Sequence, residues 1–239
     1  MGENTITHIM KVSVAVKKYP IFFLQEVHCS KDKQKCWTSE WGYSAIFGSL
    51  STASAGVNII FSNNFSFQIL KTISDPKGRF IVVDIKTESK TLTLANIYAP
   101  NNDYPFFFEN VFKHLLTFEC EEIFLGGDFN LVLDVQKDKK GGNPVTHEKS
   151  SQKVKYIVDS LDLTDIWRFG NADTKRFTWR RRNREIQSRL DFFLISASLI
   201  STTSRADISP YRNGLLSVTQ RRGFITALIP KKKKSSKPL

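Results

Sequence analysis

The sequence has no long apolar run and little cysteine, and each absence excludes a class of protein. Apolar runs such as Ile21 to Leu24 are only four residues long, whereas a membrane-spanning helix needs about 20. No basic region followed by an apolar stretch opens the chain, so we expect neither a signal peptide nor a membrane anchor. Cys29, Cys36 and Cys120 are odd in number and scattered, which argues against a secreted disulfide framework and favours an intracellular protein.

What the chain does contain is enough apolar material for a core, together with an excess of positive charge. Of its 239 residues 41% are hydrophobic, and 19 are Phe; this fits a folded rather than a disordered chain. The length fits one α/β domain as easily as two small ones, and we expect one main domain. The net charge is +12, and five of the positive charges are lysines within the last nine residues. Such a balance suits a polyanionic partner such as nucleic acid, although a solvated charged surface would explain it equally well.

Strand-like and helix-like segments alternate along the chain. The β-branched and aromatic runs predict strands, and a three- to four-residue apolar spacing predicts two helices, the first with Pro105 in its first turn. The predicted strands are 21–24, 56–61, 79–85, 92–98, 123–125, 177–180 and 190–195, and the predicted helices are 103–118 and 150–161. This alternation is typical of mixed α/β layers.

The sharpest chemical signal is Gly126-Gly127-Asp128-Phe129-Asn130, directly after a predicted strand. In an extended chain Asp128 and Asn130 would share one face, and the glycines would allow a phosphate backbone to come close. A carboxylate beside a carboxamide suits hydrolysis of a phosphodiester by water, because the first can take a proton and the second can hold a phosphoryl oxygen. Taken alone, Gly-Asp-x-Asn is also typical of a turn.

Three further polar residues lie at predicted strand ends. Glu26 is a hard oxygen ligand of the kind that holds magnesium. Tyr98 could donate a hydrogen bond to a phosphate, or could be a core residue with a solvated tip. Asp191 follows Arg189-Leu190 and would otherwise be a salt-bridge partner.

These residues lie in an ordered series of motifs. The series is Leu24-Gln25-Glu26-Val27-His28, Ala55-Gly56-Val57, Gly78-Arg79-Phe80, Asn96-Ile97-Tyr98-Ala99-Pro100-Asn101, Gly127-Asp128-Phe129-Asn130, Phe177-Thr178-Trp179 and Ser188-Arg189-Leu190-Asp191. It resembles the endonuclease domain of LINE-type (non-LTR) retrotransposons, within the endonuclease/exonuclease/phosphatase family that includes apurinic-site endonucleases and DNase I. The resemblance covers residues 21–208.

The resemblance implies a DNase I-like four-layer αββα sandwich of two mixed sheets, incomplete at both ends. It implies that Glu26 is a ligand of Mg²⁺ or Mn²⁺, and that Tyr98 contacts a phosphate. By the same resemblance Asp128 would orient or deprotonate the attacking water, Asn130 would support the scissile phosphate, and Asp191 would orient a catalytic histidine.

The chain departs from the family's pattern at both ends. Residues 1–20 lack the family's Asn-x-Asn-Gly-like motif, so we expect them to replace its first strand atypically. The family's Ser-Asp-His is absent near Asp207, and no histidine follows Asp191. Residues 216–226 instead resemble the start of a reverse-transcriptase domain, which suggests a deletion or splice. We expect residues 209–239 to be a basic, mobile tail in which 224–229 could form a strand.

Three functions follow as hypotheses. The first is a Mg²⁺-dependent DNA endonuclease that is weak or inactive because the Asp-His pair and the N-terminal Asn are missing. The second is a non-catalytic nucleic-acid-binding relic that uses Arg180, Arg181, Arg182 and Arg184 with the lysine tail, although these arginines could equally form a solvated loop. The third is a phosphatase of the same family. We expect a monomer with DNA as its partner, infer no protein partner, and note that Pro230 followed by four lysines permits nuclear import.

Overall fold

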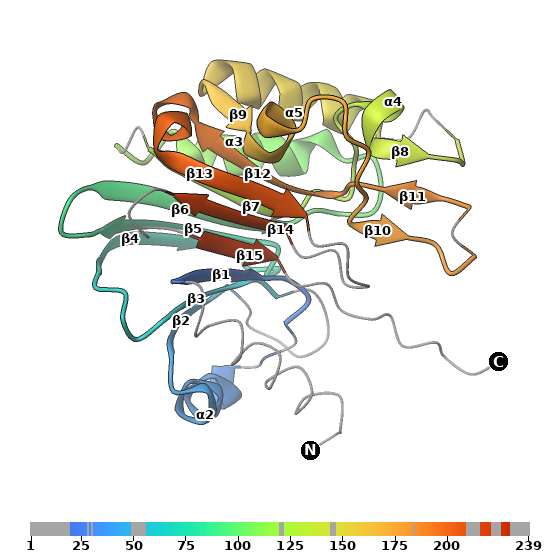
Figure 1. Cartoon of the computed structure of the whole chain (residues 1–239). Helices are drawn as coiled ribbons and strands as arrows, with labels where there is room; N and C mark the ends of the chain where they lie inside the picture. Colours follow the sequence, from blue (N-terminus) through green and yellow to red (C-terminus); the bar gives the residue numbers. More distant parts are fainter. Residues whose placement is uncertain are drawn as a thin grey trace.

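The structure is a computed structural model, which describes residues 20–27, 29, 31–48, 56–119, 122–143, 147–183, 185–208, 216–220 and 226–229. Two layers of β-sheet pack against each other, and helices lie on their outer sides (Figure 1). The predicted α/β sandwich of the DNase I-like type is therefore confirmed. Residues 1–19, which we expected to replace the family's first strand, lie outside the described residues.

The larger sheet has six strands in the order β4-β5-β6-β7-β12-β9. The strands are β4 (Gln68–Ser74), β5 (Phe80–Lys86), β6 (Thr91–Tyr98), β7 (Ile123–Asp128), β12 (Asp191–Ser196) and β9 (Leu163–Asp165). Neighbours are antiparallel except β6 and β7, which are parallel and are connected through helix α3 (Pro105–Leu115). A parallel pair needs such a crossover, and this one brings the carboxyl ends of β6 and β7 to the same edge.

The second layer is built from two three-stranded sheets, β1-β3-β2 and β13-β14-β15. Their strands are β1 (Ile21–Leu24), β3 (Asn58–Phe61), β2 (Ser44–Phe47), β13 (Thr203–Ile208), β14 (Leu216–Gln220) and β15 (Thr226–Ile229). Strand β15 lies beside β1, so the two sheets continue each other across one face of the larger sheet (Figure 1). Residues 216–220 and 226–229, which we expected within a mobile tail apart from a strand at 224–229, thus form two paired strands.

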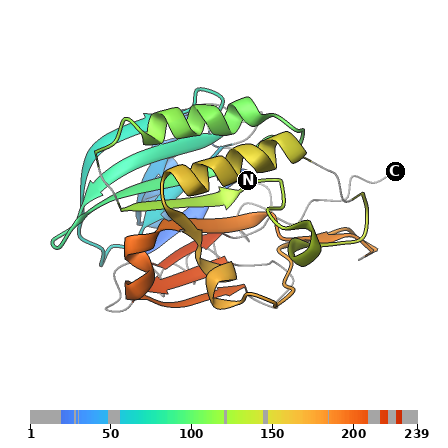
Figure 2. The same ribbon diagram turned by 90° about the horizontal axis from the view of Figure 1, so that it is seen from above.

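Helices α3 and α5 (Glu148–Ser160) lie side by side over the outer face of the larger sheet (Figure 2). Helix α3 begins with Pro105 at its first helical positions, as predicted, and buries Phe107, Phe108, Val111 and Leu115. These apolar residues recur every three or four positions, so one stripe of the helix faces the sheet. Helix α2 (Lys31–Trp41) lies on the other side of the molecule, below β2 (Figure 1).

Both faces of the larger sheet are buried, which explains its near-continuous apolar strands. In β5, Ile81 and Val83 belong to the core between the two sheet layers, whereas Phe80 and Val82 belong to the core under α3 and α5. Each fully buried side chain of this size contributes about 1.5–3 kcal/mol. The two cores hold the larger sheet rigid between them and fix the strand ends at its edge.

The predicted strands and both predicted helices are present, although several boundaries differ. The strand predicted at 177–180 is the short β10 (Trp179–Arg180), and the helix predicted over 103–118 ends at Leu115. Sequence patterning missed α2, β2, β4, β13 and the 3-10 helix η1 (Ala197–Thr202), together with shorter elements described below. No helix among the described residues is long and apolar enough to cross a membrane.

Candidate active site

Three of the predicted residues lie side by side at the edge where β6 and β7 end. Tyr98 is paired in register with Asp128 on the parallel strand β7, and Asp128 is paired with Asp191 on the antiparallel strand β12. Residues paired in this way point to the same face of a sheet. Tyr98 packs against the core between the two sheet layers, so all three side chains point toward the second layer.

The second layer supplies Glu26 to the same place. Glu26 follows the end of β1, and its Oε1 accepts a 2.9 Å hydrogen bond from the Tyr98 hydroxyl. Its backbone has a φ of +57°, a left-handed conformation that is uncommon for a residue with a side chain. Burial, followed by the charge and hydrogen bond of Glu26, raises the pKa of Tyr98. Tyr98 is therefore a hydrogen-bond donor at neutral pH.

We expected Asp128 and Asn130 to lie on one face of an extended strand. In the structure a turn joins the two residues instead. Strand β7 ends at Asp128, and Asn130 has a left-handed φ of +52°. The Asp128 Oδ1 accepts a 3.0 Å hydrogen bond from the Asn130 backbone N–H, and the Asn130 side-chain amide donates to the Ala99 carbonyl at 2.6 Å. Phe129, between them, is buried. The turn interpretation of Gly-Asp-x-Asn is therefore confirmed, and the chemical roles of Asp128 and Asn130 stay predictions.

The Gly126-Gly127 pair is required by packing within the protein. A Cβ on Gly126 would come 2.3 Å from the ring of Phe193, and one on Gly127 would come 2.0 Å from the carbonyl oxygen of Ile97. Both distances are far below van der Waals contact. We had attributed these glycines to the approach of a phosphate backbone, but the atoms that approach them belong to neighbouring strands.

A buried amide beneath the site joins the two sheet layers, and sequence patterning gave it no role. Asn96 is fully buried; its side-chain nitrogen donates to the carbonyls of Leu24 at 3.0 Å and Asn58 at 2.9 Å. Its Oδ1 accepts a hydrogen bond from the Gln25 side chain at 2.6 Å. Three hydrogen bonds from one side chain therefore fix the end of β1 against β6, one residue before Glu26.

A second residue without an assigned role is Arg79, from the Gly78-Arg79-Phe80 motif. Its guanidinium lies 5.2 Å from the centre of the Tyr98 ring and donates to the Tyr98 carbonyl at 3.3 Å. A cation at this position adds positive charge beside Tyr98, which suits an anionic substrate.

The Phe177-Thr178-Trp179 and Ser188-Arg189-Leu190-Asp191 motifs are in contact. The buried Thr178 hydroxyl accepts hydrogen bonds from the backbone N–H groups of Leu190 at 2.9 Å and Asp191 at 3.3 Å. These bonds hold the start of β12 in place, so Thr178 positions the Asp191 backbone.

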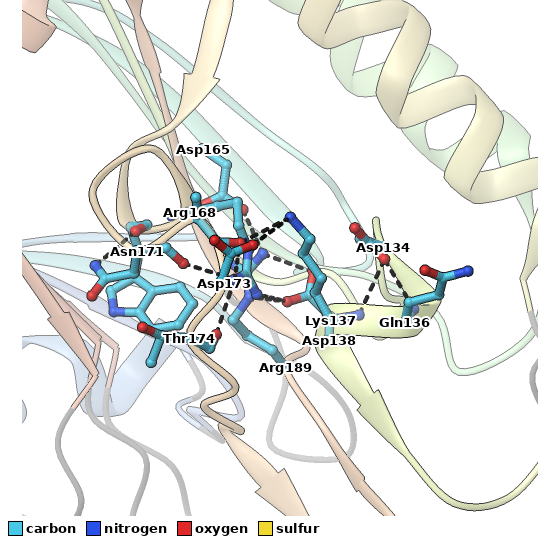
Figure 3. A network of polar contacts seen from close by, with 12 residues as sticks. Asp134, Gln136, Lys137, Asp138, Asp165, Arg168, Asn171, Asp173, Thr174 and Arg189 are labelled. Atoms are coloured by element: carbon cyan, nitrogen blue, oxygen red, sulfur yellow. Dashed lines mark hydrogen bonds and ion pairs between the residues drawn. The ribbon is translucent and has the colours of Figure 1, made fainter.

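The same loop is anchored by a buried ion network (Figure 3). The Arg189 guanidinium binds both carboxylate oxygens of Asp138 at 2.7 and 2.8 Å and reaches Asp165 at 2.6 Å, while Arg168 also binds Asp138. Burial alone would lower the pKa of Arg189, but the charges and hydrogen bonds of Asp165 and Asp138 raise it. The network joins α4 (Val135–Asp138), β9 and α6 (Ile166–Gly170) to the loop that leads into Asp191.

The predicted arginine cluster lies on a ribbon that extends from this edge. The ribbon is a small sheet of β10, β11 (Gln187–Ser188) and β8 (Lys139–Lys140), which projects from the body (Figure 1). Arg180, Arg181 and Arg182 are exposed on it, and Arg184 lies outside the described residues. Strand β11 ends three residues before Asp191, so the ribbon that carries these arginines leads directly into β12 and the candidate site.

The histidines that the structure describes make their contacts away from Asp191. The His147 ring contacts the Asn101 carbonyl at 2.7 Å, and the His114 ring lies beside Phe80. Among the described residues, no group of three or more His, Cys, Asp or Glu side chains is arranged to hold a metal ion. Magnesium is often held by one or two carboxylates and several waters, so the half-buried Glu26 carboxylate fits its chemistry.

Comparison of the sequence with known proteins finds a transposon protein. No family model matches the sequence. Over 195 residues, 80% of the chain, it is 31% identical to the Transposon TX1 uncharacterized 149 kDa protein of Xenopus laevis. The chain spans 15% of the length of that relative.

Three of the similar solved structures are named as endonucleases. The AP endonuclease LMAP from Leishmania major matches with a TM-score of 0.71 and 14% identity, covering 85% of this chain and 78% of that one. An AP endonuclease from Archaeoglobus fulgidus matches with a TM-score of 0.68 and 20% identity, covering 84% and 87%. The endonuclease domain of the non-LTR retrotransposon TRAS1 matches with a TM-score of 0.61 and 16% identity, covering 85% and 84%. The resemblance inferred from the motifs is thus confirmed in fold and in its transposon relative.

Proposed function

We propose that this endonuclease-like domain is a retrotransposon-derived, Mg²⁺-dependent DNA endonuclease whose cleavage is weak. The observation that carries the proposal is the hydrogen bond from Tyr98 to Glu26, formed beside the paired carboxylates Asp128 and Asp191. The order of these residues along the chain matches the motif series of such endonucleases, and the solved structures with this fold include proteins of that name.

Each side chain has a chemical role in the proposal. The Asp128 carboxylate would accept the proton of the attacking water, since a general base must lie within hydrogen-bond reach of the proton that it takes. The Asn130 amide would donate an N–H to a phosphate oxygen, and Tyr98, which is protonated, would donate its O–H there or to Glu26. Asp191, at the start of β12, would support Asp128 from the neighbouring strand.

Glu26 would hold the divalent metal, Mg²⁺ or Mn²⁺. When bound, such a metal neutralises negative charge that develops on a phosphate during hydrolysis. Asn96 and Gln25 would keep the Glu26 backbone at a constant distance from β6. The Tyr98 hydroxyl would fix the orientation of the Glu26 carboxylate.

We propose weak cleavage because the chain has no Asp-His pair after Asp191. Loss of a single preorganised electrostatic group typically lowers a rate about 100- to 1000-fold, and groups that act as a unit do not add simply. Slow nicking at high protein concentration is therefore the expected behaviour.

Nicking of supercoiled plasmid in Mg²⁺ tests the proposal. The wild-type chain should nick slowly, and both chelation of the metal and Asp128→Ala should abolish nicking. Asp173→Ala is a matched control, because the Asp173 side chain is 94% exposed and lies outside the site. Nicking that survives Asp128→Ala would contradict the proposal, because it would have to come from another source.

Binding without cleavage is the outcome that would favour the second hypothesis. The exposed Arg180, Arg181 and Arg182 are the observation behind it. A triple alanine variant should bind duplex DNA more weakly, and its log-log salt dependence should be about 0.9 shallower for each lost phosphate contact. Release of terminal phosphate from an oligonucleotide without strand nicking would instead favour the phosphatase hypothesis.

A further inference from the structure

Two aromatic side chains at the start of α3 are exposed and touch each other. Tyr104 is 48% exposed and Phe106 is 65% exposed, and their ring centres are 5.9 Å apart. In the run Phe106-Phe107-Phe108, the second and third rings are buried under the helix while the first points to solvent. Single exposed apolar residues are common, but two contacting rings form a surface large enough to recognise a flat ligand.

The topology places this pair at the edge that carries the candidate site. Strands β6 and β7 are parallel, so α3 must return the chain from the edge where β6 ends to the opposite edge where β7 begins. The first turn of α3, with Tyr104 and Phe106, therefore lies on the side of Tyr98 and Asp128. Leu116, which is 60% exposed at the other end of the helix, lies on the far side.

The loop between Tyr98 and Tyr104 is held to the site. The Ala99 backbone N–H donates to the Asp128 carbonyl at 2.8 Å, and the Ala99 carbonyl accepts from the Asn130 side chain at 2.6 Å. The Asn101 carbonyl contacts the His147 ring. The position of the aromatic pair relative to Asp128 is therefore fixed by contacts of the loop.

The acidic groups nearest to the pair in sequence have partners that offset their charge. Asp103 accepts backbone N–H bonds from Lys149 and Ser150 at the start of α5, where the helix dipole is positive. Desolvation acts to raise the pKa of the Asp103 carboxyl, but the hydrogen bonds outweigh this effect and lower the pKa. Glu109 is paired with Lys113 on α3. These two carboxylates therefore add little uncompensated negative charge beside the rings.

We propose that Tyr104 and Phe106 form a stacking platform for an unpaired nucleobase of the DNA strand next to the scissile phosphate. This inference rests on the proposed function and adds the class of substrate structure: DNA with a base outside the helical stack. Aromatic rings bind bases through their faces with little sequence preference. The net charge of +12 favours a polyanion such as nucleic acid over a neutral or basic protein surface as the occupant.

Equilibrium binding to two duplexes tests the platform. One duplex carries a single unpaired 2-aminopurine, the other an abasic residue at the same position, and calcium replaces magnesium so that binding is measured separately from cleavage. The wild-type chain should bind the unpaired base about 5- to 100-fold more tightly than the abasic duplex, and should quench 2-aminopurine fluorescence. Tyr104→Ala with Phe106→Ala should remove this preference and leave abasic binding unchanged.

Two further variants make the result specific. Leu116→Ala, at the far end of α3, should keep the full preference for the unpaired base. The variant with Tyr104→Trp and Phe106→Tyr should also keep this preference, because both positions stay aromatic. The inference is overturned if the alanine pair retains the preference, or if it weakens binding to both duplexes equally. It is also overturned if the pair mediates association between copies of the chain, seen in sedimentation and lost in the alanine pair. Wild-type nicking without a base preference would overturn the platform alone, whereas failure to bind either duplex at low salt would overturn the proposed function as well.

Discussion

Asn96 on β6 and Asn58 on β3 are buried amides in the two facing sheet layers, and they differ in whether their side chains have hydrogen-bond partners. The Asn96 amide makes three hydrogen bonds that connect the two sheet layers. Among the residues that the structure describes, the buried side-chain nitrogen and oxygen of Asn58 have no hydrogen-bond partner, although its backbone carbonyl accepts a hydrogen bond from Asn96. Unsatisfied buried groups destabilise, so substitution of the two residues should change stability in opposite directions.

Asn96→Ala should destabilise the protein and loosen the site. It leaves the carbonyls of Leu24 and Asn58 and the amide of Gln25 without their partner, and each unsatisfied buried group costs about 1–3 kcal/mol. Urea unfolding should show a loss of at least about 2 kcal/mol, and Mn²⁺ binding should weaken if Glu26 is its ligand. The exposed Asn102 provides a control, since Asn102→Ala should change neither. An unchanged midpoint for Asn96→Ala would contradict the role of this residue as a clamp.

Asn58→Val should have the opposite effect and stabilise the protein. The substitution removes two unsatisfied buried polar atoms, keeps the backbone carbonyl that Asn96 binds, and introduces a residue that favours strands. We expect the free energy of unfolding to rise by about 1–3 kcal/mol, measured by urea denaturation. If the variant is less stable than the wild type, the Asn58 amide must have a partner in solution.

The residues of the candidate site could be found from sequence to different degrees. Glu26, Tyr98 and Asp191 were predicted at strand ends from local patterning, and they lie at strand ends. Their chemical roles stay predictions. The functions of Asn96 and Arg79 depend on contacts across the sheet or between the layers, with partners far away in sequence. A single sequence carries no local signal for such contacts.

Among secondary-structure elements, the ion network of Asp138, Arg168, Arg189 and Asp165 connects four segments of the chain. Asp138→Ala would leave Arg189, which is 1% exposed, without its two-pronged partner. Breaking a buried pair from one side typically costs about 3–5 kcal/mol. Thermal or urea unfolding should show a loss of this size, with earlier exposure of the loop before Asp191 in hydrogen exchange.

A surface ion pair gives a matched control for this prediction. Lys137 and Asp173 are 3.4 Å apart, with side chains 39% and 94% exposed. Lys137→Ala should cost less than about 1 kcal/mol, as is usual for exposed pairs. The double variant Asp138→Leu with Arg189→Met should recover part of the loss, because apolar residues can replace a buried pair. Equal losses for the buried and the surface variants would contradict the proposed anchoring role.

Elements with strong periodicity were predicted correctly, and the missed ones lack it for physical reasons. Helices α3 and α5 bury one stripe, so their apolar residues recur at helical spacing. Strand β4 lies at a sheet edge with almost every residue exposed, so it has no alternation. The elements α4, α6, β8 and β9 are two to five residues long and are held by tertiary contacts such as the ion network. Short segments of this kind leave no pattern in a sequence window.

For the whole molecule, the second sheet layer is completed by strands from the C-terminal part of the chain. Strand β14 pairs with β13, β15 pairs with β14, and β15 lies beside β1. The sequence indicated that the resemblance to the endonuclease ends near residue 208. It could not show that the strands after this point would complete the layer, because strand pairing depends on distant partners. A chain ending after Ile208 would expose the edges of β13 and β1 and uncover part of the core between the layers.

Two truncations separate the structural role of these strands from the electrostatic role of the lysines after Pro230. The chain ending at Ile208 should lose cooperative unfolding and aggregate, because an unpaired sheet edge and uncovered apolar faces both promote association. The chain ending at Pro230 keeps β14 and β15 and removes five lysines, so it should unfold within a few degrees of the full chain. Its DNA affinity should show a shallower salt dependence, by about 0.9 for each lysine that contacts a phosphate.

Differential scanning calorimetry measures the change in unfolding, and a salt titration of DNA binding measures the change in salt dependence. A chain ending at Ile208 that unfolds cooperatively at the same temperature as the full chain would show that β14 and β15 are dispensable for the fold, and the second layer would then depend on β1, β3, β2 and β13.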